Sequence, residues 1–294
     1  MKLLVTGAGG QLGRAIKRLR KDGVDAVGTT RAELDITDVS TLARILDDLR
    51  PDVIVNAAAF TSVDRAEADR DGAFHANETG ARLLARAVAS AGISLIHIST
   101  DFVFDGIATR PYRPGDPTGP LNVYGASKLA GELAVLEADA RALVVRTSWL
   151  YWLGGRNFAT AIVAQLREPG RASVVTDERG SPTSAAILAE LLVLAAQRKA
   201  AGDDISGIRH FADEGVTSRY DFACAIRDEA VAAGLVDPSA SVAPVAGRAD
   251  APVRRPAYSA LDSGDICAEL GFPATPWRDA LTRAFREDRG LLPF

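Results

Sequence analysis

Short runs of apolar residues alternate along the chain with longer segments in which apolar positions recur every three or four residues. Short continuous runs are typical of strands buried on both faces of a parallel sheet, and the longer pattern is typical of helices with one apolar face. The predicted strands are residues 2–6, 24–28, 53–56, 93–98, 142–146, 172–175 and 208–211. The predicted helices are residues 12–21, 39–49, 71–91, 124–139, 157–167, 184–199, 217–233, 262–270 and 277–287. This alternation predicts an α/β fold built on a doubly wound parallel sheet.

A glycine-rich turn joins the first predicted strand to the first predicted helix. It reads Gly7-Ala8-Gly9-Gly10-Gln11-Leu12-Gly13. Glycines let the backbone approach a pyrophosphate, and the N-terminus of a helix supplies unpaired N–H groups and a positive dipole end. Strand, glycine turn and helix in this order predict a dinucleotide site, so residues 1–150 are expected to form an NAD(P)-binding Rossmann domain.

The alternation is less regular in residues 151–294. We expect these residues to form mainly a smaller C-terminal α/β lobe that binds substrate at the carboxyl edge of the sheet. No linker of distinct composition separates the two parts, so we expect them to be interleaved. Loops are predicted at residues 60–64, 106–120 and 244–256, and a long loop such as the second is typical of a lid or a binding loop.

The end of the second predicted strand bears on the choice of cofactor. An acidic residue there would hydrogen-bond the ribose 2′-hydroxyl of NAD. The chain has Thr29-Thr30-Arg31 instead, and a guanidinium suits a 2′-phosphate. The sequence therefore favours NADPH, with NADH as the alternative; Arg31 would then be a solvated loop residue.

Small and polar residues follow the third and fourth predicted strands. The third strand runs into Ala57-Ala58-Ala59, whose small side chains leave room for a ligand. The fourth runs into Ser99-Thr100-Asp101. In an open α/β sheet the active site lies at the carboxyl ends of the strands, so these residues are candidates for it.

Tyr124 and Lys128 are four residues apart on a predicted helix, so their side chains share one face. An ammonium beside a phenol stabilises the phenolate, so the pKa of Tyr124 is expected to fall from about 10 towards neutrality. Such a phenol exchanges a proton with a substrate oxygen near neutral pH. Alone, this spacing would indicate no more than a surface pair; the glycine turn and Thr100 give it weight.

Composition excludes several classes of function. Lys and Arg number 34 and Asp and Glu 38, so the net charge is 34 − 38 = −4; without a basic block, this argues against nucleic acid as a partner. No apolar run reaches the roughly 18 residues of a membrane span. The two cysteines form no C-x-x-C pair, which fits a cytoplasmic location, and the three histidines share no metal-ligand spacing.

Together and in this order, the motifs resemble the extended short-chain dehydrogenase/reductase superfamily and, within it, the dTDP-4-dehydrorhamnose reductase family. The narrower resemblance rests on segments spread over nearly the whole chain: residues 10–13, 56–67, 99–106, 124–132, 146–151, 180–183 and 255–256. It implies NADPH-dependent reduction of the C4 carbonyl of a nucleotide-linked 4-keto-6-deoxyhexose. The expected reaction converts dTDP-4-dehydro-L-rhamnose, or a close analogue, into dTDP-L-rhamnose or its counterpart.

The resemblance also implies roles for individual residues. The catalytic residues would be Thr100, Tyr124 and Lys128, with Tyr124 as the proton donor. Together with the glycine turn, the cofactor-binding residues would be Gly7, Gly10, Gln11, Leu12, Gly13, Arg31, Asp35, Ile36, Ala57, Ala58, Ala59, Tyr124 and Lys128. The substrate-binding residues would be Thr61, Val63, Thr100, Asp101, Phe102, Trp149 and Arg255, with Arg255 on the diphosphate.

Three positions depart from the family pattern and leave the identity of the sugar open. Phe102 replaces a usual tyrosine, Arg219 a common tryptophan and Tyr258 a usual asparagine. Some family members carry a dimer-bridging metal on a glutamate of the first helix. That helix has no glutamate here, so we expect no metal, and a monomer or a homodimer.

Two rival functions remain at this point. The first is a sugar-nucleotide epimerase or dehydratase of the same superfamily, although a dehydratase needs an acidic pair after the threonine and this chain has Asp101-Phe102. The second is a non-catalytic NADP-binding regulatory subunit of the methionine adenosyltransferase type. The intact set of Thr100, Tyr124 and Lys128 favours the reductase.

Overall fold

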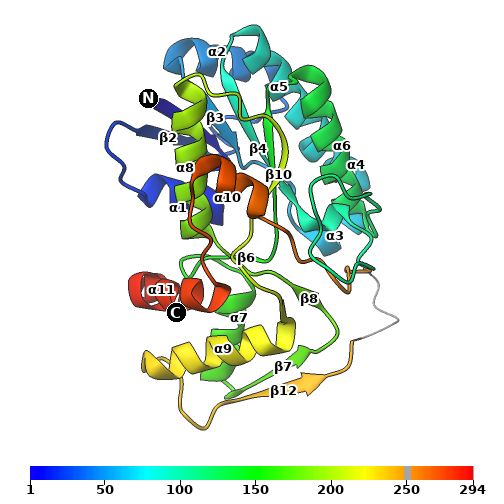
Figure 1. Cartoon of the computed structure of the whole chain (residues 1–294), viewed down its shortest axis with the longest axis vertical. Helices are drawn as coiled ribbons and strands as arrows, with labels where there is room; N and C mark the ends of the chain where they lie inside the picture. The colour runs from blue at the N-terminus through cyan, green and yellow to red at the C-terminus, as the bar shows by residue number, and fades with distance from the viewer. Residues whose placement is uncertain (248–252, 294) are drawn as a thin grey trace.

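A six-stranded parallel sheet forms the larger part of the molecule (Figure 1). The computed structural model describes residues 1–247 and 253–293. The strand order is β10-β5-β4-β3-β1-β2, with bounds β1 Lys2–Thr6, β2 Asp25–Thr29, β3 Val53–Asn56, β4 Ser94–Thr100, β5 Leu143–Thr147 and β10 Gly207–His210. The chain changes direction across the sheet between β1 and β3, which is where α/β sheets bind ligands. The predicted doubly wound fold is confirmed.

Alternate residues of β1, β3, β4 and β5 enter two different cores, one on each face of the sheet. Leu3 and Val5 pack with α1 (Gln11–Arg18), α8 (Ala185–Ala200) and α10 (Gly264–Leu270). Leu4 packs instead with α2 (Val39–Leu49), α5 (Ala81–Ser90) and α6 (Val123–Ala138). Because helices cover both faces, every position of the central strands β3 and β5 is buried, and the sequence shows continuous apolar runs there.

The predicted helix 71–91 is interrupted. It consists of α4 (Arg70–Phe74), a π-helix from His75 to Gly80, and α5. It is preceded by α3 (Val63–Ala68), which begins inside the predicted loop 60–64. In the π-helix, Asn77 donates to Ser127 Oγ on α6 at 2.9 Å and accepts from the Phe60 backbone N–H at 2.8 Å. The π-helix thereby ties the loop after β3 to α6.

A smaller lobe lies at the carboxyl edge of the sheet (Figure 1). Its elements are α7 (Phe158–Arg167), β7 (Arg171–Val175), α9 (Arg219–Ala232), β12 (Ser241–Val245) and α11 (Trp277–Asp288). β7 and β12 pair in parallel, so the predicted loop 244–256 in fact begins within a strand. Residues 248–252 of that loop lie outside the described residues.

Two further pairs of short strands join segments that come after β5 in the chain. β6 (Leu150–Tyr151) pairs with β9 (Thr183–Ser184), and β8 (Arg179–Gly180) pairs with β11 (Thr217–Ser218). Segments later than residue 150 also return to the large sheet, since β10 is one of its strands and α8 and α10 cover one face. A domain boundary at residue 150 stays a prediction.

A buried ion pair fixes the loop between β4 and α6. Arg146 on β5 donates from Nε to Glu132 Oε1 at 2.9 Å and from Nη2 to Glu132 Oε2 at 2.7 Å. Both side chains are at most 2% exposed. Arg146 Nη1 also donates to the Pro114 carbonyl at 3.3 Å, so the loop is fastened to the sheet. In the described part of the chain, no helix has the length and apolar character needed to cross a membrane.

Candidate active site

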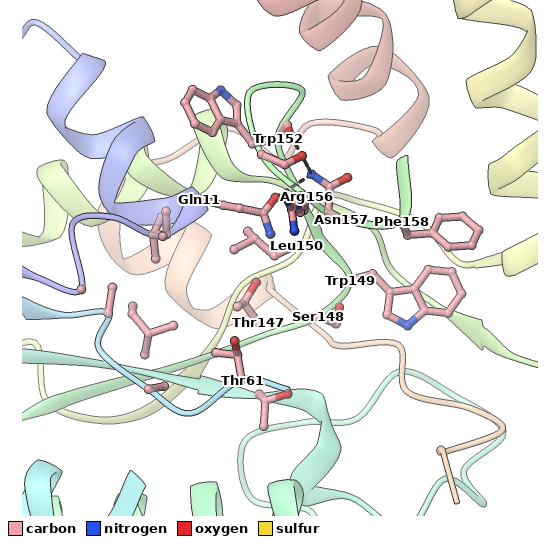
Figure 2. A pocket seen from close by; sticks show the side chains of 18 of the residues that line it. Gln11, Thr61, Thr147, Ser148, Trp149, Leu150, Trp152, Arg156, Asn157 and Phe158 are labelled. Atoms are coloured by element: carbon pink, nitrogen blue, oxygen red, sulfur yellow. Dashed lines mark hydrogen bonds between the residues drawn. The ribbon is translucent and has the colours of Figure 1, made fainter. Parts of the chain in front are cut away.

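A cavity of about 870 Å³ opens at the carboxyl edge of the sheet. Residues from both parts of the molecule line it. The large sheet contributes the glycine turn after β1 and residues that follow β3, β4 and β5. Residues 152 and 154–158 and Arg219 of the smaller lobe also line it. Figure 2 shows Gln11 entering from one side and Trp149 and Phe158 lying next to each other on another.

The glycine turn has the close backbone packing that a pyrophosphate site requires. Gly7 has φ +66°, and a Cβ there would stand 2.6 Å from the Ala57 carbonyl oxygen. A Cβ on Gly13 would stand 2.5 Å from Ala8 Cα. No side chain caps the N-terminus of α1 at Gly10, so the N–H groups of its first turn are available to an anion. These features fit a dinucleotide.

Most of the predicted cofactor residues line the cavity: Gly7, Gly10, Gln11, Leu12, Gly13, Ala57, Ala59, Tyr124 and Lys128. Four others do not line it. Ile36 and Ala58 belong to the core on the face of the sheet that α2, α5 and α6 cover. The exposed Arg31 pairs with Asp35 Oδ2 at 3.1 Å. The cofactor roles of these four residues stay predictions.

The N-terminus of α6 packs directly on the turn after β4, which is a 3-10 helix, η2 (Asp101–Val103). Thr100 caps this turn, because its Oγ1 accepts from the Phe102 N–H at 3.2 Å. The ring of Phe102 meets the ring of Tyr124 edge-on, with centroids 5.6 Å apart. Asn122 caps α6 by accepting from the Gly125 N–H at 2.8 Å. This packing brings the Tyr124 hydroxyl to the Thr100 hydroxyl.

The predicted fall in the pKa of Tyr124 is wrong for this structure. Burial raises the pKa of Tyr124 to about 12, with a smaller contribution from Asp101 and an opposing one from the hydrogen bond to Thr100. Lys128 does share the helix face and lines the cavity. Its ammonium, however, donates to the Ile98 carbonyl at 2.7 Å, and burial lowers the pKa of Lys128 to about 8.

A chain of buried hydrogen bonds determines how Lys128 is held. Asn56 Oδ1 accepts from Thr6 Oγ1 at 2.6 Å, which leaves the Asn56 amide nitrogen to donate to His97 Nδ1 at 3.0 Å. This pattern assigns the imidazole proton to Nε2, which faces Lys128 Nζ at 3.4 Å. Burial holds the pKa of His97 well below its usual value, so the ring is neutral. His97 therefore offers Lys128 no acceptor, and the ammonium donates to Ile98.

All predicted substrate residues line this cavity: Thr61, Val63, Thr100, Asp101, Phe102, Trp149 and Arg255. Asp101 is 2% exposed, and among the described residues its Oδ2 has no hydrogen-bond partner. Burial raises the pKa of Asp101 to about 6. Trp149 has φ +43°, a left-handed backbone conformation that costs free energy in a non-glycine residue. Such strain is concentrated at functional sites.

Two features of the cavity escaped the sequence prediction. The segment from Trp152 to Asn157 crosses towards the glycine turn, where Asn157 Nδ2 donates to Gln11 Oε1 at 2.7 Å (Figure 2). The pattern Asn157-x-x-Thr160 could have indicated a helix cap, and a capping box is present. No local pattern could have indicated the contact with Gln11, 146 positions away. The second feature is Arg219, which the sequence marks only as a departure from the family pattern.

A glycine turn at the reversal point of a parallel sheet, sharing a cavity with Thr100, Tyr124 and Lys128, defines an NAD(P)-binding oxidoreductase of the extended short-chain type. Comparison with known proteins narrows this class. The chain belongs to the dTDP-4-dehydrorhamnose reductase family: the family described as "RmlD substrate binding domain" matches residues 1–289.

Individual relatives resemble the chain over nearly its full length. It is 42% identical over 290 residues to dTDP-4-dehydrorhamnose reductase of Mycobacterium tuberculosis, covering 96% of this chain and 92% of the relative. It is 38% identical over 293 residues to the enzyme of the same name from Aggregatibacter actinomycetemcomitans, covering 97% and 99%. The crystal structure of dTDP-4-dehydrorhamnose reductase from Bacillus anthracis in complex with NADP superposes with a TM-score of 0.88 at 35% identity, covering 97% and 98%.

Proposed function

We propose that this protein uses NADPH to reduce the C4 carbonyl of a nucleotide-linked 4-keto-6-deoxyhexose, namely dTDP-4-dehydro-L-rhamnose or a close analogue. One observation carries the proposal: Thr100, Tyr124 and Lys128 face the same cavity as the glycine turn. The names of the relatives support the same reaction. The structure from Bacillus anthracis, which contains NADP, supports the cofactor.

The residues present fit NADPH. Gly7, Gly10 and Gly13 would hold its pyrophosphate at the uncapped N-terminus of α1, and Ala57 and Ala59 would leave room for it beside β3. Arg31 is the candidate for the 2′-phosphate. When bound, NADPH supplies the hydride that reduces the carbonyl carbon.

Tyr124 would give a proton to the substrate oxygen. With a pKa of about 12 the phenol is fully protonated at neutral pH. An alkoxide is about as basic as hydroxide, whose conjugate acid has a pKa of about 15.7. Proton transfer from Tyr124 to the oxygen that gains charge is therefore favourable without any acidification of the phenol.

Thr100 and Lys128 would assist this transfer in different ways. The Thr100 hydroxyl, next to that of Tyr124, donates to Asp101 Oδ1 at 3.1 Å; with substrate bound it would donate instead to the carbonyl oxygen and orient it. Lys128 is mostly protonated at pH 7, since its pKa is about 8. Its positive charge, on a side chain that is only 2% exposed, would stabilise the negative charge that develops on the oxygen.

The rival functions receive less support. A dehydratase needs a second carboxylate after the threonine, and here the ring of Phe102 lies against Tyr124 in that position. A regulatory subunit would not need the three catalytic side chains around one cavity. We also infer that the protein works in the cytoplasm as a monomer or a homodimer; light scattering after gel filtration would decide the oligomeric state.

The test is consumption of NADPH. Purified protein with NADPH and a panel of 4-keto-6-deoxy sugar nucleotides should lose NADPH absorbance in proportion to the sugar added, and Tyr124→Phe protein serves as the control. Copurification of tightly held NAD without net consumption of NADPH would indicate an epimerase or dehydratase. Capture of a methionine adenosyltransferase without turnover would indicate the regulatory subunit.

A further inference from the structure

The charges around the cavity are mostly positive. Within the described part of the chain, the charged side chains that line it are those of Arg14, Lys128, Arg156, Arg219 and Arg255, together with a single carboxylate, that of Asp101. The phosphates of the proposed cofactor would account for the positive charges near the glycine turn. Arg219 and Arg255 belong to segments that come later in the chain, and each faces the cavity while pairing with a single carboxylate, Glu178 and Asp64 respectively.

Arg219 is held rigidly. Its guanidinium carbon lies 3.6 Å from the ring centroid of Trp149 and 4.9 Å from that of Phe158. Its Nε contacts Glu178 Oε2 at 3.4 Å, and its backbone N–H donates to the Glu178 carbonyl at 3.0 Å. The adjacent β8 and β11 pair with Ser218 opposite Arg179, which fixes the start of α9. A guanidinium held this way loses little further freedom on binding a ligand.

The donors of Arg219 that could reach a ligand are unused. Only Nε faces Glu178; within residues 1–247 and 253–293, neither terminal nitrogen makes a hydrogen bond to another residue. The side chain is 16% exposed, and burial lowers the pKa of Arg219. A desolvated cation with two free donor groups is stabilised by an anion, and a planar guanidinium matches two oxygens of one phosphate.

The neighbours of Arg219 place it within the cavity. Two charged side chains of the cavity act on the Arg219 guanidinium. Asp101, which follows the catalytic Thr100, attracts it, and Arg255 repels it. Arg255 is more exposed, at 38%, and pairs with Asp64 at 3.1 Å. Within the cavity, the charged neighbours of Arg219 are thus Asp101, which follows Thr100, and Arg255. One face of Trp149 is occupied by the guanidinium, so the indole supports Arg219 and presents no free stacking surface there.

We propose that Arg219 is a substrate-binding residue that holds the phosphate nearest the sugar, with Arg255 on the phosphate nearest the nucleoside. The inference rests on the proposed function, because it takes the substrate to be a nucleoside diphosphate sugar. An anion between the two guanidinium groups also relieves their mutual repulsion.

The test compares ligands that differ only in phosphate. The affinities of dTDP, dTMP and thymidine for the NADP-bound protein are measured by calorimetry for wild type, Arg219→Gln and Arg219→Lys. Charge-assisted hydrogen bonds predict that Arg219→Gln weakens dTDP binding by about 10- to 100-fold. Thymidine binding should not change, and Arg219→Lys should fall between the other two proteins. With the sugar substrate, Arg219→Gln should raise KM and leave kcat nearly unchanged.

A matched control separates ligand binding from packing. Glu178→Gln removes the carboxylate that pairs with Arg219 and leaves the guanidinium in place. If Arg219 binds phosphate, this variant should bind dTDP at least as tightly as wild type. If the Arg219–Glu178 pair only stabilises the fold, the two glutamine variants should be impaired alike, and thymidine and dTDP binding should fall together, which would overturn the inference.

The inference and the proposed function can fail separately. Wild-type protein that consumes NADPH with a sugar nucleotide, while Arg219→Gln binds dTDP as wild type does, would overturn the role of Arg219 alone. Wild-type protein that consumes no NADPH with any sugar nucleotide and binds no dTDP would overturn the proposed function, and the inference with it.

Discussion

Replacement of Gly125 by alanine should slow the reaction about a hundredfold in a protein that still folds. Gly125 follows Tyr124 in the first turn of α6, where the helix lies on η2. A Cβ at this position would stand 2.1 Å from the Phe102 carbonyl oxygen and 3.1 Å from Pro120 Cβ. Ordinary contact begins at 3.4 Å, so the helix and the turn must separate by 3.4 − 2.1 = 1.3 Å.

This separation acts on the two groups that handle the substrate oxygen. The Phe102 N–H is hydrogen-bonded to Thr100 Oγ1 at 3.2 Å, so a shift of Phe102 moves Thr100 relative to Tyr124. A misplacement of about 1 Å at a reacting centre costs about 10²-fold in rate. Overpacking of this kind also destabilises a protein by about 1–3 kcal/mol, which the fold can absorb.

The assay is kcat/KM with NADPH and the best substrate of the panel, together with thermal unfolding and NADP affinity. Gly115→Ala is the matched control: this exposed glycine has no atom within 4 Å of an added Cβ, and the variant should behave as wild type. A folded Gly125→Ala protein with wild-type kcat/KM would refute the reasoning, because contact between α6 and η2 would then not set the distance from Thr100 to Tyr124.

Three further changes test other parts of the structure. Tyr124→Phe should lower kcat by a factor on the order of 10² or more with NADP affinity retained, since only the proton donor is lost; unchanged turnover would remove Tyr124 from the mechanism. Glu132→Gln leaves the buried guanidinium of Arg146 unpaired and should cost about 3–5 kcal/mol in urea unfolding; a change well below 1 kcal/mol would contradict the anchoring role of the pair. Asp213 is 2% exposed, and burial raises its pKa to about 8 from 3.8. Its protonated form therefore contributes stability that is present below pH 3.8 and is lost as the pH rises through about 8. The unfolding free energy of wild type minus that of Asp213→Asn should fall over this window, and a flat difference would show that Asp213 is ionised in the folded protein.

The main sheet could be predicted from the sequence because its strands are buried on both faces. Leu3 and Leu4 belong to different cores, so apolar residues follow one another without a break, and the helices on either side keep their own periodicity. The start of α2 is likewise set by its own residues, since the Asp38 side chain accepts from the N–H groups of Ser40 and Thr41. The sequence was therefore sufficient to predict those helices and strands that are determined by their own residues.

Elements defined by distant partners could not be predicted in this way. β12 is a strand because it pairs with β7, about seventy positions earlier, and its own residues, Ser-Val-Ala-Pro-Val, include a proline that a central strand would exclude. The π-helix from His75 to Gly80 exists where α6 packs closely: a Cβ on Gly131 of α6 would stand 2.1 Å from the Asn77 carbonyl. Neither feature leaves a periodic pattern in its own segment.

The pKa values and hydrogen-bond partners in the site could not be predicted from local sequence either. Spacing alone placed Tyr124 and Lys128 on one helix face, but the acceptor of the Lys128 ammonium is the Ile98 carbonyl, 30 positions away. The pKa of Tyr124 is set mainly by burial. Helical spacing fixes which side chains are neighbours along an element, whereas protonation depends on the whole environment.

The raised pKa of Tyr124 favours carbonyl reduction over alcohol oxidation at neutral pH. At a pKa of about 12, only about 10⁻⁵ of the phenol is ionised at pH 7. Such a group readily donates a proton to an alkoxide, but it is almost never in the form that could take one from an alcohol. Alcohol oxidation needs the phenolate, and its rate should rise about tenfold per pH unit up to about pH 8, where Lys128 loses its charge, whereas carbonyl reduction should be nearly flat through neutrality. The burial that makes Tyr124 a weak acid therefore suits it to carbonyl reduction.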